Sequence, residues 1–238
     1  MRKGGEVMLN VLRQEEKYAL NFREAIQFQH CFSQLLMTDP YSEKGSYTVR
    51  SLYFDTVDDR DFFDKLTEQN LRRKIRLRIY SPEDGSAKLE MKQKNGIYQR
   101  KRSLTISRED ALALIHGQLG VLLHYPEDFA AELYCLMNTE CYRPKSIVEY
   151  QRRAFMAREN NIRLTFDSGI SATESSFELF SPNLPLYPVS DLDQVTFEVK
   201  YDGFMLSYIK DIISTVDRRS LSSSKYCLSR SVGYPLQL

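Results

Sequence analysis

The chain has 238 residues, of which 42% are hydrophobic, and a formal net charge of +1 at pH 7. This length is typical of one large domain or two small ones, with room for a sizeable core. The near-neutral charge excludes a generally basic nucleic-acid binder, so any positive site must come from the arrangement of the charges.

The first part of the chain is predicted to consist mainly of strands. Alternating apolar and polar residues indicate a strand over 11–20, and Asn21 is placed to cap a helix over about 22–37. The apolar stripe available on this helix consists of Ile26, Phe32, Leu35 and Leu36. The same alternation predicts strands over 47–55, 73–80, 87–94 and 98–107, with Asn95-Gly96 turning the last two into a hairpin.

The second part adds more helices. Ser107 and Asp110 resemble a capping box ahead of one helix, and residues 127–138 form a second candidate. Strands are predicted over 145–157, 162–173 and 195–202, the first two joined by a turn at 159–161. A short final helix starts near Ser224. A further helix follows Gly203, with an apolar stripe of Phe204, Tyr208, Ile209, Ile212, Ile213 and Val216.

Antiparallel strands with helices around them predict an α+β fold. We expect the sheet to close into an antiparallel β-barrel with flanking helices. The chain shows no internal repeat or linker-like segment, so a single domain over residues 1–238 is expected.

The stretch RRKIRLRIY, residues 72–80, carries a row of like charges. Side chains of a strand alternate between its two faces, so Ile75, Leu77 and Ile79 share a core face. The opposite face then carries Lys74, Arg76 and Arg78. Arg76 and Arg78 lie about 7 Å apart, and their repulsion is roughly 0.6 kcal/mol in water and roughly 2 kcal/mol at an effective dielectric of 20.

The same division recurs in strand after strand, with apolar residues on one face and mainly cations on the other. The charged faces carry Lys88, Glu90 and Lys92; Lys101; Arg163 and Asp167; and Glu198 and Lys200. The run Arg100-Lys101-Arg102 leaves the register of its strand open, and so does the segment 147–153. A solvated outer face explains one such strand, but the repetition favours an enclosed cationic surface that selects a polyanion such as a phosphate chain.

The carboxylates Glu90 and Glu198 have two alternative roles. Each could pair with the lysine two residues further on, Lys92 or Lys200. Otherwise they could hold a divalent metal that bridges phosphate oxygens.

The chain resembles the catalytic domain of vacuolar transporter chaperone proteins, the VTC domain, which belongs to the CYTH-like superfamily of triphosphate tunnel metalloenzymes. The matching segments occur in the family order over nearly the whole chain. They are EEKYAL (15–20), SLYFDT (51–56), IRLRIY (75–80), LEMKQK (89–94), EYQRRAF (149–155), RLTFD (163–167), FEVKYDG (197–203) and SSKYCLS (223–229).

The resemblance implies a β tunnel whose interior cations bind a triphosphate or polyphosphate, with Mn²⁺ or Mg²⁺ as cofactor. It implies Glu198 as the metal ligand and Tyr150 and Ser224 as hydrogen-bonding residues. Lys200 follows Glu198 on the same face and is expected to be a further cation or a salt-bridge partner. The implied catalytic residues are Arg76, Arg78, Lys92, Arg152 and Arg163. The implied phosphate-binding residues are Lys17, Arg50, Lys101, Tyr150, Lys200, Ser224 and Lys225.

The expected activity is therefore polyphosphate synthesis from ATP. A metal-dependent inorganic or nucleoside triphosphatase and a non-catalytic polyphosphate-binding module are the alternatives. The sequence has no apolar run long enough for a membrane helix, no signal peptide, and four cysteines without metal-like spacing, all typical of a cytoplasmic protein with reduced thiols. Such a chain would release its product in the cytoplasm or work with a separately encoded membrane protein.

Overall fold

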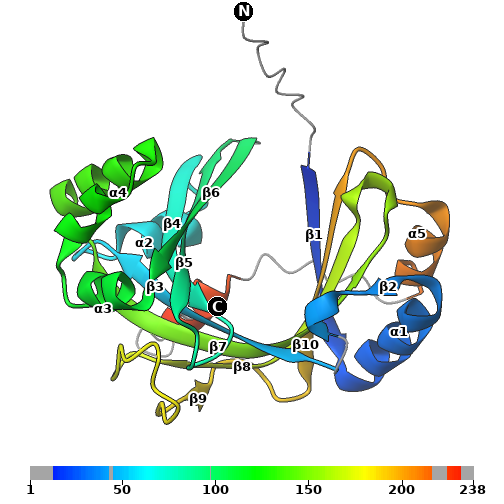
Figure 1. The fold of residues 1–238 in the computed structure, drawn as a ribbon. Coiled ribbons are helices and arrows are strands. Elements are labelled where there is room, and N and C mark those ends of the chain that lie inside the picture. The colour runs from blue at the N-terminus through cyan, green and yellow to red at the C-terminus, as the bar shows by residue number, and fades with distance from the viewer. Residues whose placement is uncertain (1–12, 43–44, 97, 216–223, 232–238) are drawn as a thin grey trace, which may run out of the picture. The chain divides into compact units, whose positions relative to one another are not determined.

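The computed structural model describes residues 13–42, 45–96, 98–215 and 224–231 (Figure 1). The strands are β1 (Arg13–Asn21), β2 (Met37–Thr38), β3 (Tyr47–Asp55), β4 (Leu71–Ile79), β5 (Ser86–Asn95), β6 (Tyr98–Ser107), β7 (Arg143–Met156), β8 (Arg163–Thr173), β9 (Tyr187–Pro188) and β10 (Gln194–Asp202). The α-helices are α1 (Phe22–Leu35), α2 (Arg60–Leu66), α3 (Arg108–Ile115), α4 (Asp128–Thr139), α5 (Ser207–Ile213) and α6 (Lys225–Ser231). The short 3-10 helices are η1 (Pro40–Ser42), η2 (Leu119–His124) and η3 (Glu159–Asn161). Within the described ranges, no helix combines the length and apolar character needed to cross a membrane.

The expected α+β fold is confirmed. The strands form one large sheet in the order β1-β10-β8-β7-β3-β4-β5-β6, with β2 paired to β7 and β9 to β8. Over the residues that the structure describes, β1 and β6 are the two ends of this order, so the predicted closed barrel is not confirmed. The described chain divides into two compact units, and strands β7 and β8 contribute to both. The single domain expected from the sequence stays a prediction.

Unit 1 comprises residues 1–46, 152–168 and 193–222. Its core is aromatic: Phe28 and Phe32 of α1 pack on the sheet, where Phe166 and Phe197 stack with ring centroids 4.7 Å apart. Helix α1 begins as predicted, because Asn21 and Glu24 form a reciprocal capping box.

The predicted apolar stripes of α1 and α5 are only partly correct. The buried residues of α1 are Ala25, Phe28 and Phe32, whereas Ile26 and Leu35 are about half exposed. The buried set is spaced 0, 3 and 7, which follows the helical period better than the predicted one. In α5, Ile209 and Ile213 are buried. Phe204 and Tyr208 of the predicted stripe are exposed, and Val216 lies outside the described residues.

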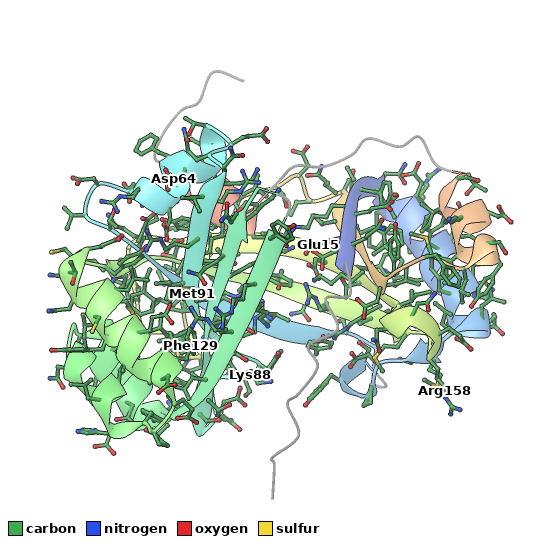
Figure 2. All side chains as sticks on the ribbon, turned by 90° about the horizontal axis from the view of Figure 1, so that it is seen from above. Glu15, Asp64, Lys88, Met91, Phe129 and Arg158 are labelled. Atoms are coloured by element: carbon green, nitrogen blue, oxygen red, sulfur yellow. The ribbon has the colours of Figure 1, made fainter. Side chains whose placement is uncertain are left out.

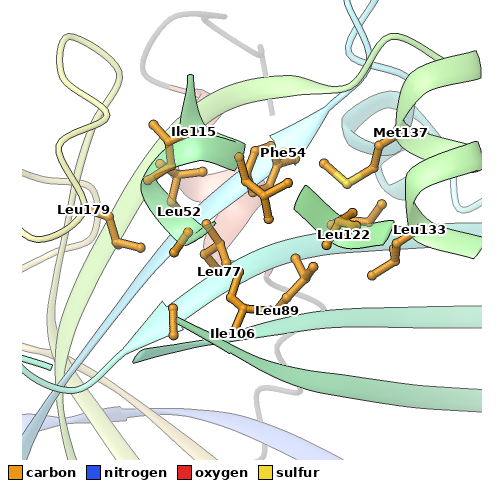
Figure 3. Close-up of a cluster of buried hydrophobic side chains, with 14 of the residues drawn as sticks. Leu52, Phe54, Leu77, Leu89, Ile106, Ile115, Leu122, Leu133, Met137 and Leu179 are labelled. Atoms are coloured by element: carbon orange, nitrogen blue, oxygen red, sulfur yellow. The ribbon is translucent and has the colours of Figure 1, made fainter. Parts of the chain in front are cut away.

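Unit 2 comprises residues 47–151, 169–192 and 223–238. One face of β3–β6 is apolar and packs against α3, η2 and α4 (Figure 3). Leu77 and Leu89 lie directly opposite one another on this face. Because side chains alternate along each strand, this buried face forces the residues between them onto the other side of the sheet.

Helix α2 was not predicted from the sequence. The backbone N–H groups of Asp61 and Phe62 in its first turn donate to Asp55, a residue at the end of β3 rather than at the helix boundary. Tyr226 of α6 also donates to Asp55, at 2.6 Å. One fully buried carboxylate therefore anchors two helices of unit 2.

Candidate functional site

A cationic face on β4, β5 and β6 is the main charged feature of unit 2. The register pairs Arg78 with Lys88 and places Lys74, Lys92 and Lys101 side by side across the three strands. This confirms the predicted division of residues 72–80 into a core face and a charged face. The cations on this face are Arg72, Lys74, Arg76, Arg78, Lys88, Lys92, Lys94 and Lys101.

Glu90 lies at the centre of this cationic face. Its Oε2 is 2.7 Å from Nε of Arg76 and 3.7 Å from Nη1 of Arg78, and its Oε1 contacts Lys101. Burial opposes ionisation, but Arg76, Arg78 and Lys101 outweigh it and hold the pKa of Glu90 at about 2.

The register of the Arg100-Lys101-Arg102 strand is resolved by the pairing of β5 with β6. Lys101 lies opposite Lys92 on the cationic face. Arg102 points to the other face, where it pairs with Glu132 of α4 and lies 4.7 Å from the ring centroid of Phe129. Figure 2 labels Phe129, which belongs to α4. Lys101 is therefore the member of this run that belongs to the candidate site.

Tyr53 of β3 is a site residue that the sequence analysis missed. Arg76 Nη1 donates to its hydroxyl at 3.1 Å, and its ring stacks on Tyr226 at 5.1 Å. Burial opposes ionisation of the phenol, yet Arg76, Arg78 and Lys74 lower the pKa of Tyr53. Strand alternation was the available signal, because it places Tyr53 opposite the core residues Leu52 and Phe54.

Three further residues implied by the resemblance lie near β4 in unit 2: Tyr150, Ser224 and Lys225. The Lys225 ammonium lies 4.7 Å from the ring centroid of Tyr150, which is buried. Lys74 donates to the Ser224 hydroxyl, and Cys227 N–H donates to the same oxygen at 3.4 Å, so Ser224 also caps α6. The structure thus brings all three residues predicted from the resemblance near β4.

Arg50 is the exception among the predicted phosphate-binding residues. It lies opposite Ile79 on the core side of β3 and is 5% exposed. Its guanidinium pairs with Glu149 at 2.5 Å and donates to the carbonyls of Leu179 and Ser181. The register therefore turns Arg50 away from the cationic face, where the resemblance had placed it, and gives it a structural role.

A second charged face lies in unit 1, on β1, β10, β8 and the end of β7. Lys17 lies opposite Glu198, and Lys200 lies opposite Arg163 on β8. Arg152 shares this face, as the resemblance implied, because it binds Asp167 bidentately at 2.6 and 2.7 Å. Parity in β8 had already placed Asp167 beside Arg163.

Four cations of this second face, Lys17, Arg152, Arg163 and Lys200, have carboxylate partners. Arg163 pairs with Asp39 at 2.7 Å, and Lys200 pairs with Glu198. Lys17 Nζ is 3.0 Å from Glu15 Oε1 and 3.4 Å from Glu198 Oε2. By contrast, Glu90 is the one carboxylate on the cationic face of β4–β6 in the described sequence. Unit 2 therefore carries the strong positive excess.

Glu198 and Glu15 are two carboxylates of this face that could bind a divalent metal. Carboxylate oxygens are the ligands that Mg²⁺ and Mn²⁺ prefer, and here one ammonium, that of Lys17, already lies between the two carboxylates. In the ranges that the structure describes, no group of three or more His, Cys, Asp or Glu side chains is arranged to hold a metal. A metal at Glu198 and Glu15 would therefore need ligands from outside this pair of carboxylates.

The fold and these faces define an α+β protein with a cationic sheet surface suited to polyanions. The VTC domain family model matches residues 12–234, and the chain belongs to this family. The resemblance inferred from the ordered sequence segments is thereby confirmed.

Several solved structures are similar to this chain. A "putative adenylate cyclase" from Bacillus halodurans is 14% identical with a TM-score of 0.47, covering 86% of this chain and 88% of that chain. The PH1012 and PH1819 proteins from Pyrococcus horikoshii are each 10% identical, with TM-scores of 0.46 and 0.45. Each covers 91% of this chain, and the matches cover 98% and 97% of those chains. A comparison with curated proteins finds no match.

Proposed function

We propose that the protein is a polyphosphate polymerase that transfers the γ-phosphate of ATP to a growing polyphosphate chain. The observation that carries this proposal is the cationic face of β4–β6, where eight cations stand against the single carboxylate of Glu90. Membership of the VTC domain family supports the same kind of chemistry.

Charge repulsion on this face favours an anionic ligand. Lys74, Lys92 and Lys101 lie directly opposite one another on neighbouring strands. Like charges about 5 Å apart repel by roughly 0.8 kcal/mol in water and roughly 3 kcal/mol at an effective dielectric of 20. A phosphate chain relieves this repulsion along its whole length, because every unit brings negative charge.

The residues of this face have separable roles in phosphoryl transfer. Arg76 and Arg78 bind phosphoryl oxygens and neutralise the charge that spreads over the transferred group. Lys92 and Lys101 bind neighbouring units of the chain. Glu90 orients Arg76 through the 2.7 Å contact and stays ionised, so it does not compete as a proton donor.

Unit 1 supplies the remaining groups of the proposal. Glu198 and Glu15 would hold Mn²⁺ or Mg²⁺, which supplies Lewis-acid stabilisation of phosphate oxygens when bound. Arg152 and Arg163 are oriented by Asp167 and Asp39. The closed β tunnel expected from the sequence belongs to this proposal too. A separately encoded membrane protein is the proposed recipient of the product.

Incubation of the protein with ATP and Mn²⁺ tests the function. We expect long acid-insoluble phosphate chains. Release of orthophosphate without chains supports a triphosphatase instead. If neither product forms but tripolyphosphate binds, the protein is a binding module, and absence of binding contradicts every form of the proposal.

A further inference from the structure

The carboxylates of unit 1 that could bind a metal, Glu15 and Glu198, form ion pairs with two lysines. Glu15 and Lys17 on β1 face Lys200 and Glu198 on β10, so that each acid lies opposite a base. Lys17 Nζ bridges Glu15 and Glu198 at 3.0 and 3.4 Å, and Lys200 donates to the other oxygen of Glu198. Both oxygens of Glu198 are therefore in contact with an ammonium group.

We propose that Lys17 and Lys200 are built-in counter-ions of this carboxylate pair and that a divalent cation enters only together with a phosphate chain. In the free protein the lysines neutralise Glu15 and Glu198. When a phosphate chain binds, its oxygens pair with the two lysine ammonium groups, and the divalent cation binds the two carboxylates. This inference rests on the proposed function and adds an order of binding to it.

The charge balance requires this coupling. The two carboxylates and two ammonium groups sum to zero, so a divalent ion added alone leaves two uncompensated positive charges. Glu198 is only 7% exposed, and water screens such charges poorly at a site this buried. A phosphate chain brings the compensating negative charge in the same step.

The lysines, not the arginines of this face, are the groups free to shift. Arg152 is held by two parallel contacts to Asp167, a geometry that fixes a planar guanidinium. A lysine ammonium is a point charge on a flexible stem, and its three donors can be transferred from a carboxylate to a phosphate. Lys17 and Lys200 remain about a quarter exposed, so phosphate can reach them.

Titration of the free full-length protein with Mn²⁺, followed by electron paramagnetic resonance, tests the inference. We expect weak binding by the wild type. Lys17→Met keeps the apolar stem and removes the charge, and should tighten Mn²⁺ binding at least about tenfold, because a like charge about 4 Å from the ion is lost. Lys200→Met should act in the same direction and serves as the second variant if Lys17→Met does not fold.

Two control variants define the result. Lys210→Met removes an exposed lysine of α5 and should leave Mn²⁺ binding at the wild-type level. Glu198→Gln combined with Lys17→Met should abolish the gain. One equivalent of inorganic tripolyphosphate should give the wild type an Mn²⁺ spectrum that differs from that of Mn²⁺ and tripolyphosphate without protein.

The outcomes separate this inference from the proposed function. Mn²⁺ binding that is equally tight in the wild type, Lys17→Met and Lys200→Met overturns the counter-ion role. The variants could bind Mn²⁺ more tightly while tripolyphosphate fails to bind the wild type. In that case Glu15 and Glu198 are a metal site, but the coupled binding of metal and phosphate and the proposed function are both wrong.

Discussion

Arg76→Ala is expected to lower the rate of chain synthesis from ATP by about 10³-fold or more, while the protein stays folded. Removal of one charged group that stabilises a transferring phosphoryl group costs rate factors of this order. Arg76 is held by Glu90 and Tyr53 and points to the cationic face of unit 2, so no neighbouring cation can replace its geometry. Initial rates with ATP and Mn²⁺, with circular dichroism as a check on folding, measure the effect.

A matched arginine on the next strand but one controls for loss of charge. Arg102→Ala removes an arginine that points to the opposite face and pairs with Glu132, and the synthesis rate should stay near the wild-type value. Arg76→Lys keeps the positive charge but loses the planar guanidinium group. Its synthesis rate should therefore lie between that of Arg76→Ala and that of the wild type. Wild-type activity in Arg76→Ala rules out the proposed role of the cationic face.

Asp55→Ala is expected to lower the free energy of unfolding by about 3–5 kcal/mol, as for other buried charged groups whose partners are stranded. Asp55 is 0% exposed and accepts hydrogen bonds from the backbone N–H groups of Thr56, Asp61 and Phe62 at 2.7–3.0 Å. It also accepts a hydrogen bond from the Tyr226 hydroxyl. Its loss frees the start of α2 and the anchor of α6. Urea unfolding measures the change, and a loss below 1 kcal/mol contradicts this anchoring role.

Substitution of Asp61, the neighbouring buried carboxylate, is expected to stabilise the protein at neutral pH, whereas Asp55→Ala destabilises it. Burial and Asp55 raise the pKa of Asp61 from its ordinary value of 3.8 to about 8. Between these two values the folded protein holds a proton that the unfolded chain has lost, so stability falls as pH rises from about 4 to about 8. Asp61→Asn keeps a partner for the Tyr142 hydroxyl and removes this dependence.

The Asp61→Asn variant should therefore unfold at higher urea than the wild type at pH 7, and the difference should shrink toward pH 4. Parallel urea titrations at the two pH values measure it. An unchanged pH slope in the variant shows that Asp61 is ionised in the folded protein.

Strand alternation predicted the charged faces because it depends only on neighbouring residues. Arg76, Arg78, Lys92, Arg163 and Glu198 lie on the faces that parity assigned to them. Where apolar and polar residues did not alternate cleanly, as in the run around Lys101, parity left the register open. Pairing with β5 then resolved it.

The features that escaped the sequence depend on contacts between distant segments. Asp39 pairs with Arg163 across 124 residues, and Asp55 binds Tyr226 across 171. Arg50 was assigned by resemblance, but the register of β3 against β4 places it with the core residues. A local sequence pattern cannot predict these contacts, because they form only when distant strands pair in the sheet.

The most direct test of the central claim is a crystal structure of the protein soaked with tripolyphosphate. The account predicts phosphate oxygens within hydrogen-bonding distance of Arg76, Arg78 and Lys101, on the face that also carries Glu90. Tripolyphosphate bound elsewhere, with these three side chains left in bulk solvent, would contradict it.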